Sequence, residues 1–434
     1  MTRRLTAVGL VVLTLLMVGT VFWVLPRHGD PNSPVVGIIT LPGDGRAIVL
    51  DTRTERVFVV SDPTPRTGKH PGDVSVFDAR TGALVRTAPV GRGPSSVAVS
   101  ERFGRVFVAN AASGSVSILD ARSGVPQHTT AVGLGPSAIA IDDRSRRVFV
   151  SALRSTGGLL EGTIQLLDAA SGRPLRSVGV GGYPGIIGVD EQANRAFVVF
   201  LGDATRMLDA TTGQVIGIVP VAGAGCPLGV GVSARTTHVF IPTRRGVAVV
   251  DARSGAVLRI TPIPMAAGYI LHCTGPISMA PIAIAVRSAR VFVGDVVPFA
   301  RDRLTMLDAR NGRLLRTIAL RVSALALAID ERRGRAVVGL GAPGGVDILD
   351  VATGSSLGHI DVGGVPVAVV VDGKTGRAFV LVGQGSLPLS DPWAWIPSWA
   401  PSWLPFLPHH ERRVRRLPSH VTVLDITRDG TGSR

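Results

Sequence analysis

The sequence predicts an all-β protein, a β-propeller of eight four-stranded blades preceded by one transmembrane helix. Three observations support this. A strand-ending signature of the form Leu-Asp-Ala-Arg-Ser-Gly and its variants occurs eight times between Phe77 and Gly430. A second signature, Arg-Val-Phe-Val with its variants, recurs eight times in step with the first. Regular copies are 42 residues apart, as from Asp78 to Asp120, which is the length of a unit of four short strands.

Residues 1–25 predict a signal-anchor helix. Arg3 and Arg4 precede 21 residues, 5–25, that carry no charge, and about 20 apolar residues suffice to cross a bilayer core. A cleaved signal peptide has a shorter apolar core and a small-residue cleavage site; cleavage is the alternative. We expect a single-pass protein with a cytoplasmic N-terminus, a linker over 26–35, and all later residues outside the cytoplasm.

Residues 36–430 are predicted to form the propeller. Blades pack face to face, so both sides of each strand are covered, and innermost strands such as 138–141 and 326–329 show no polar–apolar alternation. Residues 36–43 look like a fourth strand, while the chain stops soon after a third strand at 421–424. We expect the first strand to complete the last blade and so remove open sheet edges. Seven blades is the alternative, if the last repeat, interrupted by 386–420, is not a blade.

The second repeat carries a family resemblance. Val106-Phe107-Val108-Ala109-Asn110, followed by Ser115–Asp120 and a Gly-x-Gly-Pro, resembles the YVTN-type propeller repeat of bacterial surface and periplasmic proteins. The resemblance covers about residues 36–430 and implies a propeller outside the cytoplasm. Only this repeat keeps the Asn. That family includes binding and surface proteins and is distantly similar to lactonases and haem-d1 enzymes, so the resemblance implies no single activity.

Strand direction assigns the loops to two faces. Connections between second and third strands, and between blades, lie on what we call the top face. Turns after first and third strands lie on the bottom face, where the N-terminal strand also begins. The net charge is +15. The arginines are scattered through the repeats without interleaved aromatics, so we expect no nucleic-acid partner. Many fall in bottom-face turns, which suggests contact with anionic lipids; a solvated face is the alternative.

The repeated Asp and Gly of the turns have a structural explanation, because Asp caps a turn and Gly adopts its left-handed position. The two cysteines, Cys226 and Cys273, fall in top-face loops of neighbouring blades. We expect them to form a disulfide, which an extracytoplasmic location permits. No ligand spacing supports a metal site made from them and His272, and no metal is expected.

The most unusual segment is the Trp- and Pro-rich insertion at 386–420 in the last repeat. It holds an aromatic cluster and a basic stretch, which suggest contact with a membrane interface or a protein partner. The alternative is a lid that buries the rings against the propeller's top opening. The candidate contact residues are Trp393, Trp395, Trp399, Trp403, Phe406, Arg412, Arg413, Arg415 and Arg416.

No pattern names a catalytic residue: neither a Gly-x-Ser-x-Gly elbow nor a Ca²⁺-type loop is present. The sequence therefore favours a membrane-anchored binding scaffold for an unidentified protein or cell-envelope ligand, without a cofactor. The alternative is a propeller enzyme with a central-channel site, either a lactonase-like hydrolase or a cofactor-dependent oxidoreductase.

Overall fold

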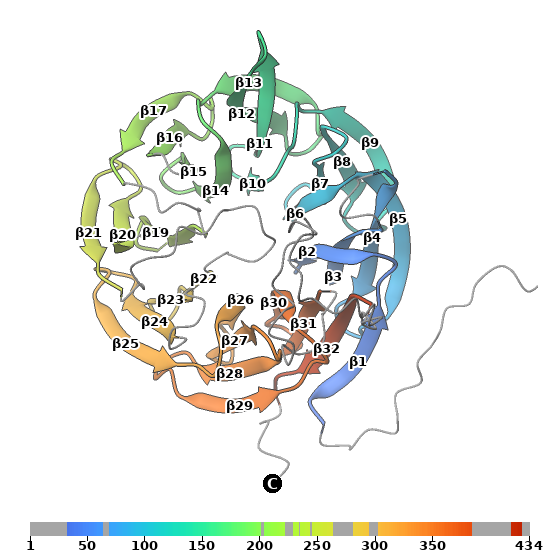
Figure 1. Ribbon diagram of the computed structural model, residues 1–434, viewed down its shortest axis with the longest axis vertical. Helices are drawn as coiled ribbons and strands as arrows, with labels where there is room; N and C mark the ends of the chain where they lie inside the picture. Colours follow the sequence, from blue (N-terminus) through green and yellow to red (C-terminus); the bar gives the residue numbers. More distant parts are fainter. Residues whose placement is uncertain are drawn as a thin grey trace, which may run out of the picture.

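The computed structural model describes residues 33–63, 69–200, 204–221, 229–233, 235–243, 245–263, 281–294, 303–383 and 418–427. Over these ranges, 32 strands form eight antiparallel four-stranded sheets, which surround a central axis as the blades of a propeller (Figure 1). The eight-bladed ring confirms the predicted all-β class and excludes the seven-bladed alternative. No helix in these ranges could span a membrane; the predicted anchor, 1–25, lies outside them.

The first four blades follow one another along the chain, each running from its inner strand to its outer strand. Blade 1 comprises β2 (Asp44–Asp51), β3 (Arg56–Asp62), β4 (Pro71–Asp78) and β5 (Leu84–Arg92). Blade 2 comprises β6 (Pro94–Ser100), β7 (Arg105–Asn110), β8 (Ser115–Asp120) and β9 (Pro126–Ala131). Blade 3 comprises β10 (Ile139–Asp142), β11 (Arg147–Thr156), β12 (Leu159–Asp168) and β13 (Pro174–Gly179). Blade 4 comprises β14 (Pro184–Asp190), β15 (Arg195–Phe200), β16 (Thr205–Asp209) and β17 (Val215–Val219).

The next three blades repeat this order, and the last is completed from the start of the chain. Blade 5 comprises β18 (Gly231–Ser233), β19 (His238–Thr243), β20 (Gly246–Asp251) and β21 (Val257–Thr261). Blade 6 comprises β22 (Ile282–Ala285), β23 (Arg290–Gly294), β24 (Arg303–Asp308) and β25 (Leu314–Ala319). Blade 7 comprises β26 (Ala324–Asp330), β27 (Arg335–Leu340), β28 (Val346–Asp350) and β29 (Ser356–Ile360). Blade 8 comprises β30 (Pro366–Asp372), β31 (Arg377–Val382), β32 (His420–Asp425) and β1 (Val35–Thr40).

The ring closes through β1, as the sequence predicts. β1 pairs antiparallel with β32, from Thr40 opposite His420 to Val35 opposite Leu424. The N–H of Asp425 donates to the carbonyl of Pro34 at 2.7 Å, which extends the pairing to the bottom face. The chain therefore enters the propeller from the bottom face, and its first and last strands are hydrogen-bonded to each other within blade 8.

The core consists of apolar layers between neighbouring blades. Seven of the eight second strands place a phenylalanine at their third residue, and every one of these side chains is fully buried: Phe58, Phe107, Phe149, Phe197, Phe240, Phe292 and Phe379. Blade 7 has the smaller Val337 at this position, also fully buried. Burying one large apolar side chain stabilises the fold by about 1.5–3 kcal/mol, so the recurring Phe of the second signature helps to hold adjacent blades together.

Glycine in the turn after the third strand meets two requirements. At Gly124 the backbone φ is 68°, in the left-handed region, which L side chains rarely adopt. A Cβ at the same position would lie 2.6 Å from Cγ2 of Val76 in the preceding blade. The repeated Asp-Ala-Arg-Ser-Gly turn thus allows close packing of one blade on the one before it.

Candidate functional site

The candidate contact residues predicted from the sequence all lie outside the described residues. They are Cys226, Cys273, Trp393, Trp395, Trp399, Trp403, Phe406, Arg412, Arg413, Arg415 and Arg416. The disulfide and the roles proposed for the insertion therefore stay predictions. The structure does place the strands that flank the insertion: Val382 of β31 and His420 of β32 are opposite each other at the top face.

The bottom face holds a repeated polar arrangement built from two turns in each of blades 1–7 and one turn in blade 8. We call the turn between the first and second strands the inner turn, and number its positions from the last residue of the first strand. The turn between the third and outer strands is the outer turn. Inner turns surround the axis and outer turns lie farther from it (Figure 1).

Outer turns use their aspartate as a structural cap. In blade 2, Oδ1 of Asp120 accepts hydrogen bonds from the N–H groups of Arg122 and Ser123, at 3.1 and 2.8 Å, and from the Ser123 hydroxyl at 2.8 Å. Burial alone would raise the pKa of Asp120. These donors and the charge of Arg105 outweigh it and hold the pKa below its ordinary value. The carboxylates are satisfied within their own turns, which agrees with the structural role predicted for them.

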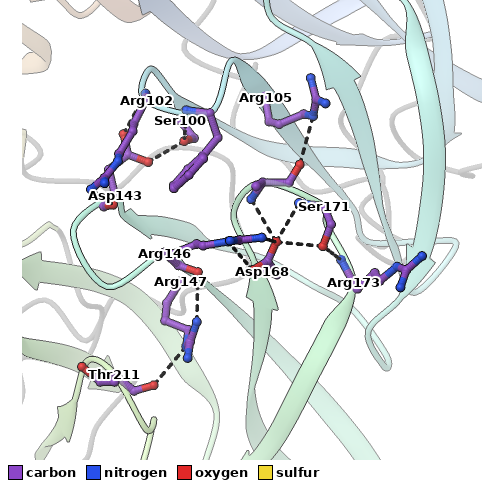
Figure 2. Close-up of polar contacts among 12 residues, drawn as sticks. Ser100, Arg102, Arg105, Asp143, Arg146, Arg147, Asp168, Ser171, Arg173 and Thr211 are labelled. Atoms are coloured by element: carbon purple, nitrogen blue, oxygen red, sulfur yellow. Dashed lines mark hydrogen bonds and ion pairs between the residues drawn. The ribbon is translucent and has the colours of Figure 1, made fainter.

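The first residue of several second strands joins its blade to the next one. Arg105 donates from Nε to the carbonyl of Ala170 at 3.1 Å, and Arg147 from Nε to the carbonyl of Thr211 at 3.0 Å (Figure 2). In blade 5, Nδ1 of His238 lies 3.1 Å from the carbonyl oxygen of Ala309. Arg335 donates to the carbonyl of Ile426 in the same way. Ala170, Thr211 and Ala309 belong to the outer turn of the following blade, and Ile426 directly follows the third strand of blade 8, so these side chains stabilise the ring.

Exposed cations occupy the third position of the inner turn in seven of the eight blades. They are Arg53, Arg102, Arg144, Arg235, Arg287, Arg332 and Lys374, and blade 4 has Gln192 instead. Several of these cations donate to backbone carbonyls of the next inner turn; Arg102, for example, bonds the carbonyl of Asp143 at 3.2 Å. A neutral carbonyl does not cancel a charge. We refer to these seven residues as the cation ring.

Carboxylates at the second position of four inner turns bind donors of the preceding blade. Glu101 accepts the N–H of Thr52 at 2.9 Å, and Glu191 accepts the N–H of Asp143 at 3.0 Å. Asp143 itself accepts the N–H of Arg102 at 3.3 Å. Glu331 accepts the N–H of Arg287 at 3.1 Å. Each carboxylate therefore links two blades at the bottom face and offsets part of the cation ring.

Blade 6 departs from this pattern and leaves a hollow against blade 5. Val286 stands at the second position of its inner turn, where blades 2, 3, 4 and 7 carry an acid and blades 1, 5 and 8 carry none. The hollow has a volume of about 140 Å³ and is lined by Ser233, Arg235, Thr236, Val286, Ala289, Ala309 and Arg310. Oγ1 of Thr236 is buried and has no hydrogen-bond partner among the described residues.

The described residues offer few groups for metal or acid–base chemistry. They contain no cluster of three His, Cys, Asp or Glu side chains that could hold a metal ion. A carboxylate–imidazole pair lies in blade 7, where Nδ1 of His359 is 2.7 Å from Oδ1 of the buried Asp347. The pair joins the third and outer strands of blade 7, away from the inner strands that surround the axis. It therefore does not form a central-channel site.

Asn110, the residue that carries the family resemblance, has a structural role. Its side chain is fully buried, and Nδ2 donates to the hydroxyls of Ser115 and Ser117 at 3.3 and 2.9 Å. The Ser117 hydroxyl also accepts the N–H of Gly91 at 3.4 Å from the preceding blade. Asn110 thus orients a serine that contacts the inter-blade connection at the top face.

Comparison with known proteins shows the fold alone. No family model and no curated protein matches the chain. Among solved structures, a europium-containing methanol dehydrogenase matches with a TM-score of 0.60 and 12% identity, over 90% of this chain and 93% of that one. Sqt1 of Saccharomyces cerevisiae gives 0.61 and 13%, over 81% and 96%. The computationally designed Ika8 protein gives 0.57 and 18%, over 80% and 96%.

Sequence reasoning did not identify the inter-blade role of Arg147 or the hollow beside Val286. An alignment of the inner turns would have drawn attention to Val286, because the sequence DERRGR at 330–335 has an acid where AVRSAR at 285–290 has valine. The inter-blade role of Arg147 could be found only in the structure, since its acceptor is a backbone carbonyl one blade farther along the ring.

Proposed function

We propose that the protein is a membrane-anchored binding scaffold whose propeller lies outside the cytoplasm, with its bottom face toward the membrane. The observation that supports this orientation is the entry point of the chain. Pro34 is hydrogen-bonded to Asp425 at the bottom face, and the predicted anchor ends only nine residues earlier, at Leu25. A linker this short holds the bottom face near the bilayer, since nine extended residues span about 30 Å.

The charge distribution supports the same orientation. The cation ring lies on the bottom face and its seven members are exposed. A leaflet that contains anionic lipids attracts such cations, and each one close to the surface contributes about 1 kcal/mol. The acids at the second inner-turn positions of four blades and the aspartates at the first positions of five blades oppose this attraction, but those aspartates are buried whereas all seven cations are exposed.

In this orientation the top face points away from the membrane and is the proposed binding surface. Loops on a rigid scaffold commonly carry ligand contacts. The insertion between β31 and β32 enters and leaves at this face, next to Val382 and His420. We assign partner binding to the insertion, with Trp393, Trp395, Trp399 and Trp403 as the proposed anchors, because tryptophan is enriched at energetically dominant interface positions.

Affinity capture from the native membrane tests this proposal. Because Val382 and His420 are cross-strand partners, residues 384–418 can be replaced by a short Asn-Gly turn that keeps the hairpin and the Ser419 contact with Leu41. Capture with the intact protein is expected to recover a partner that the deletion variant, folded by circular dichroism, does not. Equal recovery by both proteins would contradict the assignment. A redox cofactor or metal retained by the purified protein would favour the propeller-enzyme alternative.

Orientation has its own test. Right-side-out vesicles treated with protease should lose the propeller and keep the N-terminus, while inside-out vesicles should show the reverse. Liposome flotation of the domain that begins at residue 33 should be stronger on anionic than on zwitterionic lipid. Replacing Arg53, Arg102 and Arg144 with glutamine should reduce flotation, and equal binding to both lipids would contradict a membrane-facing cation ring.

A further inference from the structure

The hollow between blades 5 and 6 lies where a recurring carboxylate is missing. In the blade 2–3 and blade 6–7 interfaces, the backbone N–H at the third inner-turn position donates to an acid of the next blade. These bonds run from Arg102 to Asp143 and from Arg287 to Glu331, at 3.3 and 3.1 Å. In the blade 5–6 interface the corresponding donor is Arg235, and the residue that would accept is Val286.

Two hydrogen-bond donors, Arg235 and Thr236, face this interface although Val286 offers no carboxylate to accept from them. Arg235 has no hydrogen bond or ion pair to any other residue in the described part of the chain. Thr236 lines the same hollow, and its buried Oγ1 is also without a partner among those residues. A buried hydroxyl left without a partner is costly, and rotation about χ1 can turn it toward the hollow.

Equivalent hydroxyls in other blades are satisfied. Thr54 in blade 1 donates to Asp51 at 2.6 Å, and Ser145 in blade 3 donates to the carbonyl of Ala210 at 3.3 Å. Thr375 in blade 8 donates to Asp372 at 2.7 Å. In blade 5 the first inner-turn residue is Ser233, so Thr236 lacks the aspartate that serves Thr54 and Thr375.

The hollow is positively charged and large enough for a small anion. Two of its lining residues, Arg235 and Arg310, carry guanidinium groups, and none of the lining residues is acidic. Over the described ranges neither guanidinium is in an ion pair. The volume of about 140 Å³ exceeds several times the ~30 Å³ that one water molecule takes up in the liquid. Planar guanidinium groups match the oxygens of phosphate and carboxylate.

We propose that this hollow binds a phosphate group, which takes the place of the missing carboxylate. Its oxygens would accept from the Arg235 N–H, the Thr236 hydroxyl and the guanidinium groups of Arg235 and Arg310. Because the hollow opens on the bottom face, the phosphate group comes either from free phosphate or from a lipid headgroup. The proposal does not depend on the function proposed for the top face.

A valine-to-glutamate substitution provides the decisive variant. In V286E the new carboxylate occupies the position of Glu331 and Asp143 and fills the hollow from within the chain. Binding of inorganic phosphate to the full-length protein in a phosphate-free detergent is measured by calorimetry at constant ionic strength. We expect binding to the unchanged protein and none to V286E. Binding of equal strength to both would overturn the proposal.

Arginine variants keep the test informative if V286E does not fold. R235Q and R310Q should each weaken phosphate binding about tenfold or more, because each removes a charge-assisted hydrogen bond. R253Q is the matched control: Arg253 occupies the same outer-turn position as Arg310, one blade earlier, and does not line the hollow. It should bind phosphate as the unchanged protein does. Equal loss in R253Q and R310Q would indicate unspecific charge and contradict the site.

Soluble dihexanoyl phosphatidate distinguishes the two sources, with dihexanoyl phosphatidylcholine as the control lipid. Tighter binding of phosphatidate than of phosphate, lost in R310Q, identifies a lipid headgroup as the ligand. Tighter binding of phosphate identifies the free ion. Failure of both to bind the unchanged protein overturns the proposal.

Discussion

Nε of Arg147 in blade 3 donates a hydrogen bond to the carbonyl oxygen of Thr211 in blade 4, at 3.0 Å (Figure 2). Much of the arginine at the bottom face is used in this way, to join one blade to the next. Part of the high arginine content of the chain therefore has a structural explanation, which extends to members of the cation ring such as Arg102.

The Arg147 contact predicts a measurable loss of stability. Arg147→Gln should lower the free energy of unfolding by about 1 kcal/mol, since it removes an inter-blade hydrogen bond from a charged donor. Arg253→Gln, at an exposed outer-turn position, should change it by less than about 0.5 kcal/mol. Guanidinium denaturation followed by fluorescence compares them, and equal midpoints would refute the inter-blade role.

Ring closure predicts a contrast between two neighbouring residues. Leu41 is 5% exposed and its N–H donates to Ser419 at 2.9 Å, whereas Ile38 in β1 is 56% exposed. Leu41→Ala should cost about 2–5 kcal/mol and accelerate amide exchange in β1. Ile38→Ala should leave both almost unchanged. Similar losses in the two variants would show that β1 does not seal the ring through this inward contact.

Turn aspartates predict an acid-sensitive stability. The pKa of Asp350 is lowered by the hydroxyl and N–H of Thr353, against the smaller opposing effect of burial. A lowered folded-state pKa contributes stability that is fully present above the unfolded-state pKa of about 3.9 and is lost as the pH falls through the folded-state value.

Asp350→Asn removes this ionisation. The unchanged protein should be more stable than the variant by up to about 1 kcal/mol at pH 7, and the difference should shrink below about pH 4. Denaturation at pH 7, 5, 4 and 3 measures it. A difference that stays constant down to pH 3 would contradict the lowered pKa.

Asn110 and Ser117 should be energetically coupled. Asn110→Ala leaves the buried Ser117 hydroxyl without its Nδ2 donor and should cost about 1–3 kcal/mol. Ser117→Ala should cost less once Asn110 is absent, giving a coupling of about 1 kcal/mol in a double-mutant cycle. Additive losses would show that the 2.9 Å hydrogen bond contributes nothing to stability.

Repetition explains why the fold was predictable. The buried phenylalanine of the second strand and the capped outer turn recur in nearly every blade, so their spacing predicts strand number, direction and ring closure. Val286 was harder to interpret, because its meaning depends on Arg235 and Arg310 in two different turns that only the ring brings together. The acceptor of Arg147 is a main-chain oxygen, which every residue type carries, so no side chain in the sequence could have indicated it.

Closure by the first strand has a consequence for the timing of assembly. β1 leaves the ribosome before every other strand of the propeller, but Val35 and His420 are 385 positions apart. At about 5–20 residues per second, β1 waits roughly 20–80 s for its neighbour. During this interval its edge offers unpaired N–H and C=O groups to any other extended chain. Slow synthesis or crowded production should therefore favour misassembly through β1, before blade 8 can exist.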